Sequence, residues 1–291
     1  MTTDDDQTLI SAWLEEESRW REKFQGWDFS QLTKTGRILF NMSEEQLGWD
    51  YTQVVCQTLA EIAGEIINRE ILLLDLGTGG GEFLEAMLPK LYESIDRSEN
   101  KWGLKVYATE SYKTNFQLAK QRLISYGVTV IESEPDSLNS LLPFSNDHDP
   151  NFDLIISRHT CYNTREIDRL LKPGTGYFIT QQVDGASNQD LIELFPGHKP
   201  RWPYYTLGYA TYIFKHQAPR MKLLRAEESE TKLQFNDMGA LIVYLHAVPW
   251  LVEDFTVQKY RDVLLNLYRS GEKLKFKSKY MLLKAVKLSN K

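Results

Sequence analysis

An acid followed by a glycine-rich turn is the part of the sequence best suited to chemistry. Asp75 closes the apolar run 71–74, and glycines then occupy positions 77, 79 and 81 before an apolar helical face that includes Phe83. This order predicts a strand, a tight turn and a helix. Glycine accepts the backbone angles that bring N–H groups close to a ligand, and a helix N-terminus adds positive charge. The carboxylate favours a cationic ligand over a pyrophosphate.

Two common nucleotide-binding motifs are excluded at this turn. The dinucleotide motif G-x-G-x-x-G needs a third glycine, but the chain has Glu82 or Leu84 there, depending on the glycine from which the motif is counted. A P-loop needs Lys followed by Ser or Thr after the turn, and neither follows.

Polar residues also follow the later predicted strands. Glu110 ends the strand 105–110 and Ser111 comes next, whereas the strand 152–157 leads into Arg158 and His159. Since ligands of open α/β sheets bind beyond the carboxyl ends of the strands, we expect these side chains to lie in one crevice. The block Leu-Lys-Pro-Gly-Thr-Gly-Tyr-Phe at 171–178 introduces a further strand, 177–183.

Together these segments resemble the class I S-adenosylmethionine-dependent methyltransferases over residues 71–183. The D-x-G-x-G-x-G turn resembles their first motif, and Glu110, the apolar strand after Phe152 and the L-K-P-G block follow in the family's order. The resemblance implies an α/β fold: a Rossmann-like, doubly wound, mostly parallel sheet of seven strands. It also implies S-adenosylmethionine as cofactor, S-adenosylhomocysteine as product and no metal.

The resemblance also implies the contacts of the cofactor. Asp75 would meet the methionine part, the turn the amino-acid and sulfonium end, Glu110 the ribose, and Ser111 the adenine. Asp136 would face the adenine amino group, with Glu134 as the alternative. The predicted cofactor-binding residues are Asp75, Gly77, Thr78, Gly79, Gly81, Glu110, Ser111, Asp136 and Ser157.

The predicted catalytic residues are His159 and Arg158. His159 would take a proton from the acceptor, or else hydrogen-bond to backbone as a crevice histidine. Arg158 would hold a substrate anion or pair with an acid. The predicted substrate contacts are Trp27, Trp49, Tyr162 and Gln182. No N/D-P-P-Y motif follows the strand 152–157, which argues against amino-group methylation of DNA bases.

The flanking segments predict additions to the core. Residues 1–50 are rich in tryptophan and would form a helical, substrate-facing cap on a core of residues 51–291. The last two predicted strands, 221–228 and 279–287, enclose an insertion at about 230–278 with helices ending near Pro249 and spanning 256–270. The chain also resembles a narrower bacterial group of these enzymes, often described as ribosomal-RNA guanine methyltransferase-like, in the G-W-D-F segment at 26–29, the segment Gln181-Gln182-Val183 and the F-N-D-M-G-A segment at 235–240. An N-terminal cysteine cluster like that of the zinc-binding rRNA enzymes is missing here.

Composition and charge bound the compartment and the partners. Of the 291 residues, 42% are hydrophobic and 25% charged, as in ordinary soluble proteins. No apolar run approaches the ~18 residues of a membrane span, no secretory signal is present, and two distant cysteines indicate no disulfide framework. We therefore expect a cytoplasmic protein. Residues 259–291 hold ten Lys or Arg and two acids, which gives this segment a net charge of +8. Because the whole chain has a net charge of −6, the rest carries −14.

The sequence therefore predicts a methyltransferase that acts on a small-molecule acceptor. The alternatives are RNA base methylation through the basic C-terminal segment and cofactor binding without catalysis. The other interpretation of that basic segment is a set of solvated faces whose charge is balanced by nearby acids. This interpretation argues against RNA base methylation. The sequence does not define the acceptor atom or the oligomeric state.

Overall fold

The structure is a computed structural model that describes residues 4–23, 29–65, 69–96, 103–135, 137–144 and 151–289. The predictions for Trp27 and Asp136 therefore lie outside the described residues. The chain divides into two compact units. One comprises Met1–Met42, Asp184–Tyr204 and Glu230–Lys279, and the other comprises Ser43–Val183, Tyr205–Ser229 and Tyr280–Lys291.

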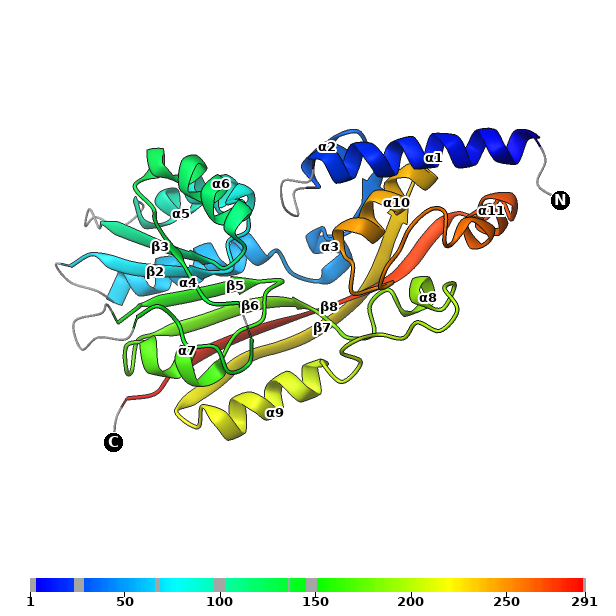
Figure 1. The fold of residues 1–291 in the computed structure, drawn as a ribbon. Helices are drawn as coiled ribbons and strands as arrows, with labels where there is room; N and C mark the ends of the chain where they lie inside the picture. The colour runs from blue at the N-terminus through cyan, green and yellow to red at the C-terminus, as the bar shows by residue number, and fades with distance from the viewer. Residues whose placement is uncertain are drawn as a thin grey trace. The chain divides into compact units, whose positions relative to one another are not determined.

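An eight-stranded mixed sheet, in the order β1-β7-β8-β6-β5-β2-β3-β4, runs through the described residues. The strands β2 to β6 pair in parallel, and β8 runs antiparallel to β6 (Figure 1). The strands are β1 Ile38–Leu39, β2 Ile71–Leu76, β3 Leu104–Glu110, β4 Thr129–Glu132, β5 Leu154–Arg158, β6 Tyr177–Val183, β7 Met221–Phe235 and β8 Leu274–Lys287. This confirms the doubly wound α/β fold. All seven predicted strands are present, and the eighth is the two-residue β1, which pairs with β7.

The last two long strands reach further than the sequence analysis predicted. β7 continues to Phe235 instead of ending at Glu228, and β8 begins at Leu274 instead of Lys279. The alternation of more and less exposed side chains persists through the polar part of β7, up to the buried Leu233 and Phe235. An antiparallel strand with one solvated face tolerates charged residues, which explains why the polar run does not end the strand.

Helices cover both faces of the parallel strands. In the unit that contains the parallel strands, α5 packs on α4 and α6. Helix α7 packs on α9 on the opposite side of the sheet (Figure 1). The helices are α3 Glu44–Leu47, α4 Tyr51–Glu65, α5 Glu82–Asp96, α6 Lys113–Leu123, α7 Thr164–Leu170 and α9 Leu207–Gln217. Pro89 lies inside α5 and does not end it. Leu88 and Leu91 are fully buried, and each buried leucine stabilises by roughly 1.5–3 kcal/mol, which offsets the cost of proline in a helix.

The other unit has its own core around α10. That helix, Met238–Ala247, is apolar on nearly every face and buried accordingly. It packs on α1, Asp4–Lys23, through a cluster that includes Trp13. The remaining helices of this unit are α2 Ser30–Lys34, α8 Gln189–Ile192 and α11 Arg261–Arg269, the last shorter than the predicted 256–270. Across the described helices, none combines the length and apolar character that a bilayer crossing needs.

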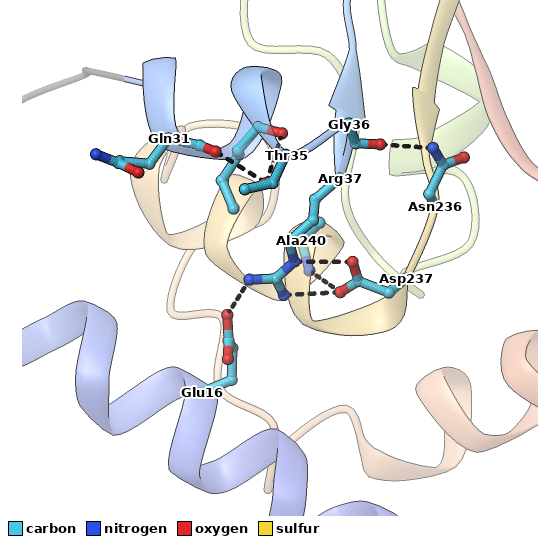
Figure 2. Close-up of polar contacts among 9 residues, drawn as sticks. Glu16, Gln31, Thr35, Gly36, Arg37, Asn236, Asp237 and Ala240 are labelled. Carbon is cyan, nitrogen blue, oxygen red and sulfur yellow. Dashed lines mark hydrogen bonds and ion pairs between the residues drawn. The ribbon is translucent and has the colours of Figure 1, made fainter.

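Arg37 joins three elements of this unit (Figure 2). Its guanidinium donates to both carboxylate oxygens of Asp237, each at 2.8 Å, and to Glu16 of α1 at 2.9 Å. Asp237 also accepts from the Ala240 N–H at 2.8 Å and so caps α10. The F-N-D part of the narrower resemblance therefore lies in a structural joint, in which Asn236 also donates to the Gly36 carbonyl.

We expect Asp237→Ala to lower the free energy of unfolding by about 2 kcal/mol, because it removes a helix cap of about 1 kcal/mol and a partly exposed ion pair of up to about 1 kcal/mol. Asp237→Asn keeps the cap oxygen and should lose about half as much. Urea unfolding measures both losses. Equal losses for the two variants would show that the cap contributes nothing.

Candidate functional site

The candidate site lies where the sheet reverses its strand order. β2 has β3 on one side and β5 on the other, and the register places Leu76 opposite Ser157. The carboxyl ends of these strands therefore meet, which brings the predicted Asp75, Glu110 and Arg158 to one edge of the sheet. Ligands of doubly wound folds bind at this switch point.

The glycine turn after β2 is anchored to the end of β3. The Gly79 N–H donates to Glu110 Oε2 at 2.7 Å, and the Tyr112 N–H donates to Oε1 of the same carboxylate at 2.7 Å. Gly79 has a φ of 65°, which residues with a side chain rarely adopt. A Cβ built at Gly79 meets no atom within 4 Å. At Gly77, in contrast, a Cβ would lie 2.5 Å from the Thr160 hydroxyl oxygen. The turn thus packs closely on the end of β5 and leaves open space at Gly79.

Asp75 is a buried acid with an altered pKa. Burial raises its pKa from the ordinary 3.8 to about 7, and the Glu110 carboxylate acts in the same direction. Thr78 and Arg158 oppose the rise. The Thr78 hydroxyl is buried and has no hydrogen-bond partner among the described residues. A cation placed beside Asp75 and Glu110 would favour the ionised form of both acids.

Other polar atoms at this edge are buried without partners. Asn115, in the first turn of α6 after β3, is 1% exposed, and neither atom of its amide has a hydrogen-bond partner. The hydroxyl of Ser133, directly after β4, is in the same condition. Since buried polar groups are normally hydrogen-bonded, these atoms and the space at Gly79 fit a polar ligand along the ends of β2, β3 and β4. The residues present therefore fit a nucleoside with a cationic end.

Arg158, the last residue of β5, lies against an aromatic ring. Its guanidinium carbon is 4.1 Å from the centre of the Phe83 ring, at the start of α5. Tyr51 packs on the same ring, with 6.0 Å between ring centres, and its hydroxyl donates to the Ser157 carbonyl at 3.2 Å. Burial lowers the pKa of Arg158, and the neighbouring groups Tyr51, Tyr280 and Asp75 raise it.

His159 follows in a left-handed conformation, with a φ of 57°. Its ring stacks on Tyr280 of β8 at 5.7 Å, and its Nε2 faces the Gln181 amide nitrogen at 3.3 Å. His159 is exposed as a residue, although its ring contacts Tyr280 and Gln181. Desolvation of the ring, together with the Arg158 charge, holds the pKa of His159 well below its ordinary value. The imidazole is therefore neutral near pH 7.

A tryptophan sets the orientation of the Gln181 amide. Trp49 is 3% exposed, and its indole N–H donates to Gln181 Oε1 at 2.8 Å. Because an indole only donates, it fixes the amide oxygen toward Trp49 and the amide nitrogen toward His159. The Nε2 of His159 is then the acceptor, and its proton lies on Nδ1.

The remaining predicted residues lie as follows. Gln182 donates to the Thr160 carbonyl at 2.9 Å and to the Thr180 hydroxyl at 2.8 Å, so its amide nitrogen holds the segment after β5. Tyr162 packs against Phe178 in the core at 5.0 Å between ring centres and does not join the Arg158 group. Ser111 is half-buried after β3, and Glu134 is exposed.

Sequence reasoning missed four residues of this site. They are Tyr51, Phe83, Tyr280 and Gln181, of which Gln181 forms a pair of consecutive amides with Gln182. The signal for Gln181 was that pair of amides at a strand exit. For Phe83 it was the position directly after the glycine turn, but Tyr51 and Tyr280 come from distant segments and carry no local signal.

Comparison with solved structures identifies the fold. A protein of Bacillus halodurans C-125 described as a candidate methyltransferase is 16% identical, with a TM-score of 0.51 over 80% of this chain and 99% of that one. A SAM-dependent methyltransferase from Aquifex aeolicus is 17% identical, with a TM-score of 0.42 over 89% of this chain and 99% of its own. No protein-family model and no curated protein matches the chain.

The similarity to the Bacillus protein supports the Rossmann-like α/β fold. At this identity it establishes the fold alone. The chemistry therefore has to be argued from the site.

Proposed function

We propose that the protein is an S-adenosylmethionine-dependent methyltransferase that acts on a small-molecule acceptor. The observation that carries the proposal is the turn from Asp75 to Gly81 at the strand switch point, tied by the Gly79 N–H to the buried Glu110. Two carboxyl groups, those of Asp75 and Glu110, lie beside the unobstructed backbone at Gly79. This arrangement suits a ligand that combines a ribose with a positive charge. A pyrophosphate would be repelled by both carboxyl groups.

Each residue has a proposed role toward this cofactor. Asp75 holds the ammonium of the methionine part. The Glu110 carboxylate, which accepts the Gly79 and Tyr112 N–H groups, also binds the ribose hydroxyls. Ser111 and Asp136 approach the adenine, and Asn115 and Ser133 supply further polar contacts. The Ser157 carbonyl, held by Tyr51, borders the reacting end.

The bound cofactor supplies a methyl group on a sulfonium, a carbon already activated for in-line displacement. The protein then has to position the acceptor atom and exclude water. Attack on the methyl group makes the acceptor's own proton more acidic, so a weak base such as His159 can take it. Since Nε2 already faces the Gln181 amide, the acceptor's proton donor has to replace that amide there.

The charge pairing of the C-terminal segment favours a small acceptor over RNA. Six of its ten basic side chains lie within 4.0 Å of a carboxylate. The pairs are Arg261–Asp262, Arg269–Asp6, Lys277–Glu230, Lys279–Asp184, Lys284–Glu61 and Lys287–Asp168. Cations paired in this way contribute less to the release of counterions that drives nucleic-acid binding. Among the described residues of the proposed 1–50 cap, Trp49 contacts Gln181 at this site.

We expect His159→Asn to leave cofactor affinity within about 3-fold and to lower turnover by roughly 10²–10⁴-fold, the usual contribution of a general base. Asparagine tolerates the left-handed backbone better than alanine does, so the change tests proton transfer and not strain. Calorimetry with S-adenosylhomocysteine and single-turnover methyl transfer measure the two quantities. Unchanged turnover would remove His159 from the mechanism.

The function is tested by calorimetry with S-adenosylhomocysteine, with NADH as the control ligand, followed by transfer of labelled methyl groups to separated small-molecule and RNA extracts. We expect heat with the first ligand only and label in the small-molecule fraction. Label in RNA alone would overturn the choice of acceptor. Binding without transfer to either fraction would leave a cofactor-binding protein without catalysis, and heat with NADH alone would exclude the methyltransferase.

A further inference from the structure

We infer that Arg158 binds an acidic group of the methyl acceptor, so that the substrate is a small molecule with a carboxylate or phosphate remote from the atom that is methylated. The inference rests on the function proposed above and names the substrate class for the same site. Its basis is a guanidinium that forms no ion pair among the described residues and lies over an aromatic ring beside His159.

Arg158 forms no ion pair in the described part of the chain, although Asp75 acts on its charge from a longer distance. No carboxylate there lies within 4.0 Å of its guanidinium, which also donates no hydrogen bond to the described residues. In contrast, Arg37 and Arg69 each lie within 4.0 Å of an acid. Burial of a cation without an ion pair is costly, and Asp75 and the Phe83 ring offset that cost only through weaker interactions. An anionic ligand would add the missing ion pair.

The ring beside Arg158 limits how it can bind. The Phe83 ring, with its centre 4.1 Å from the guanidinium carbon, occupies one side of the group, and the five N–H donors of a guanidinium lie in one plane. A planar fork of donors matches the two oxygens of a carboxylate or phosphate. This arrangement therefore presents a preformed anion subsite, which lysine at this position would not reproduce.

The neighbours of Arg158 place this subsite on the acceptor side. Across the sheet Arg158 pairs in register with Gln181 of β6, and next to it stand His159 and the ring of Tyr280. The features assigned to the cofactor lie on the other side, from Asp75 toward the ends of β3 and β4. An anion at Arg158 would thus hold the acceptor beside the group that takes its proton.

The test compares R158Q and R158K with R165Q, a change at an exposed arginine at the start of α7. Four probes are titrated by calorimetry: S-adenosylhomocysteine, 5′-methylthioadenosine (which lacks the amino-acid carboxylate), and then benzoate and phenyl phosphate on protein saturated with the first. Losing a charge-assisted pair should weaken binding of at least one anion by on the order of 10–100-fold in R158Q and less in R158K. R165Q should bind as wild type does, and S-adenosylhomocysteine should bind all variants within about 3-fold.

A second measurement identifies the acceptor itself. Small molecules labelled by the wild-type protein should be retained on an anion exchanger at pH 8, since the acidic group survives methylation. Labelled products that all pass through would overturn the inference. So would unchanged anion binding in R158Q, or a loss specific to S-adenosylhomocysteine over 5′-methylthioadenosine, which would assign Arg158 to the cofactor carboxylate. Failure of the wild-type protein to bind S-adenosylhomocysteine would instead refute the proposed function.

Discussion

Glu110→Ala should weaken binding of S-adenosylhomocysteine by about 100-fold or more. The carboxylate is expected to accept both ribose hydroxyls, and hydrogen bonds to a charged group contribute about 1.5–3 kcal/mol each. It also holds the Gly79 and Tyr112 N–H groups at 2.7 Å. Removing it therefore loosens the glycine turn as well as the ribose contact.

Two further variants separate these contributions. Glu110→Gln keeps one acceptor oxygen and exchanges the other for a donor, so it should lose most of the affinity and less of the stability. Glu132→Ala, at the position opposite Glu110 in the register of β4, removes an exposed acid from the same sheet edge and should bind normally. Calorimetry and thermal unfolding measure affinity and stability. Wild-type affinity in Glu110→Ala would remove Glu110 from the cofactor site.

The part of the site that sequence could predict is local. Asp75, the glycines and Glu110 each stand at the end of an apolar run, and the geometry of an open sheet brings such ends together. The same reasoning predicted Arg158 and His159 at the exit of β5, where Arg158 is the last residue of the strand and His159 the next one. These features need only the strand pattern and the residue that follows each strand.

The part that sequence could not predict depends on pairing between distant segments. The contact of Trp49 with Gln181 joins residues 132 positions apart, and Tyr280 reaches His159 only because β8 pairs with β6 in one register. A one-residue shift would turn Tyr280 to the other face of the sheet. No local pattern specifies that register. The stacking of Tyr280 on His159 and the tautomer of His159 therefore depend on the fold and cannot be predicted from local sequence.

The length of β7 shows the same limit. The polar run in β7 predicts a strand end at Glu228, but alternating burial of side chains is also compatible with a strand that has one solvated face. Likewise, the Arg37–Asp237 pair joins residues 200 positions apart and gives a structural reason for a motif that sequence could only match by resemblance.

Asp75→Asn should stabilise the ligand-free protein above pH 7 while weakening cofactor binding. Because the pKa of Asp75 is raised in the folded state, the acid's favourable contribution is complete below about pH 4 and is lost as the pH rises through about 7. A shift of about 3 units corresponds to roughly 4 kcal/mol, an upper bound for the stability gained by the neutral, similarly shaped asparagine at pH 8. At pH 4 the two proteins should unfold at similar urea concentrations.

The same acid couples cofactor binding to protons. An ammonium beside Asp75 favours its ionised form, so binding near pH 7 should release a proton and affinity should increase between pH 6 and 8. Calorimetry in two buffers of different ionisation enthalpy measures that release. In Asp75→Asn the release, the increase with pH and most of the affinity should disappear together. Proton release that persists in the variant would assign the coupling to another group and leave Asp75 with a structural role.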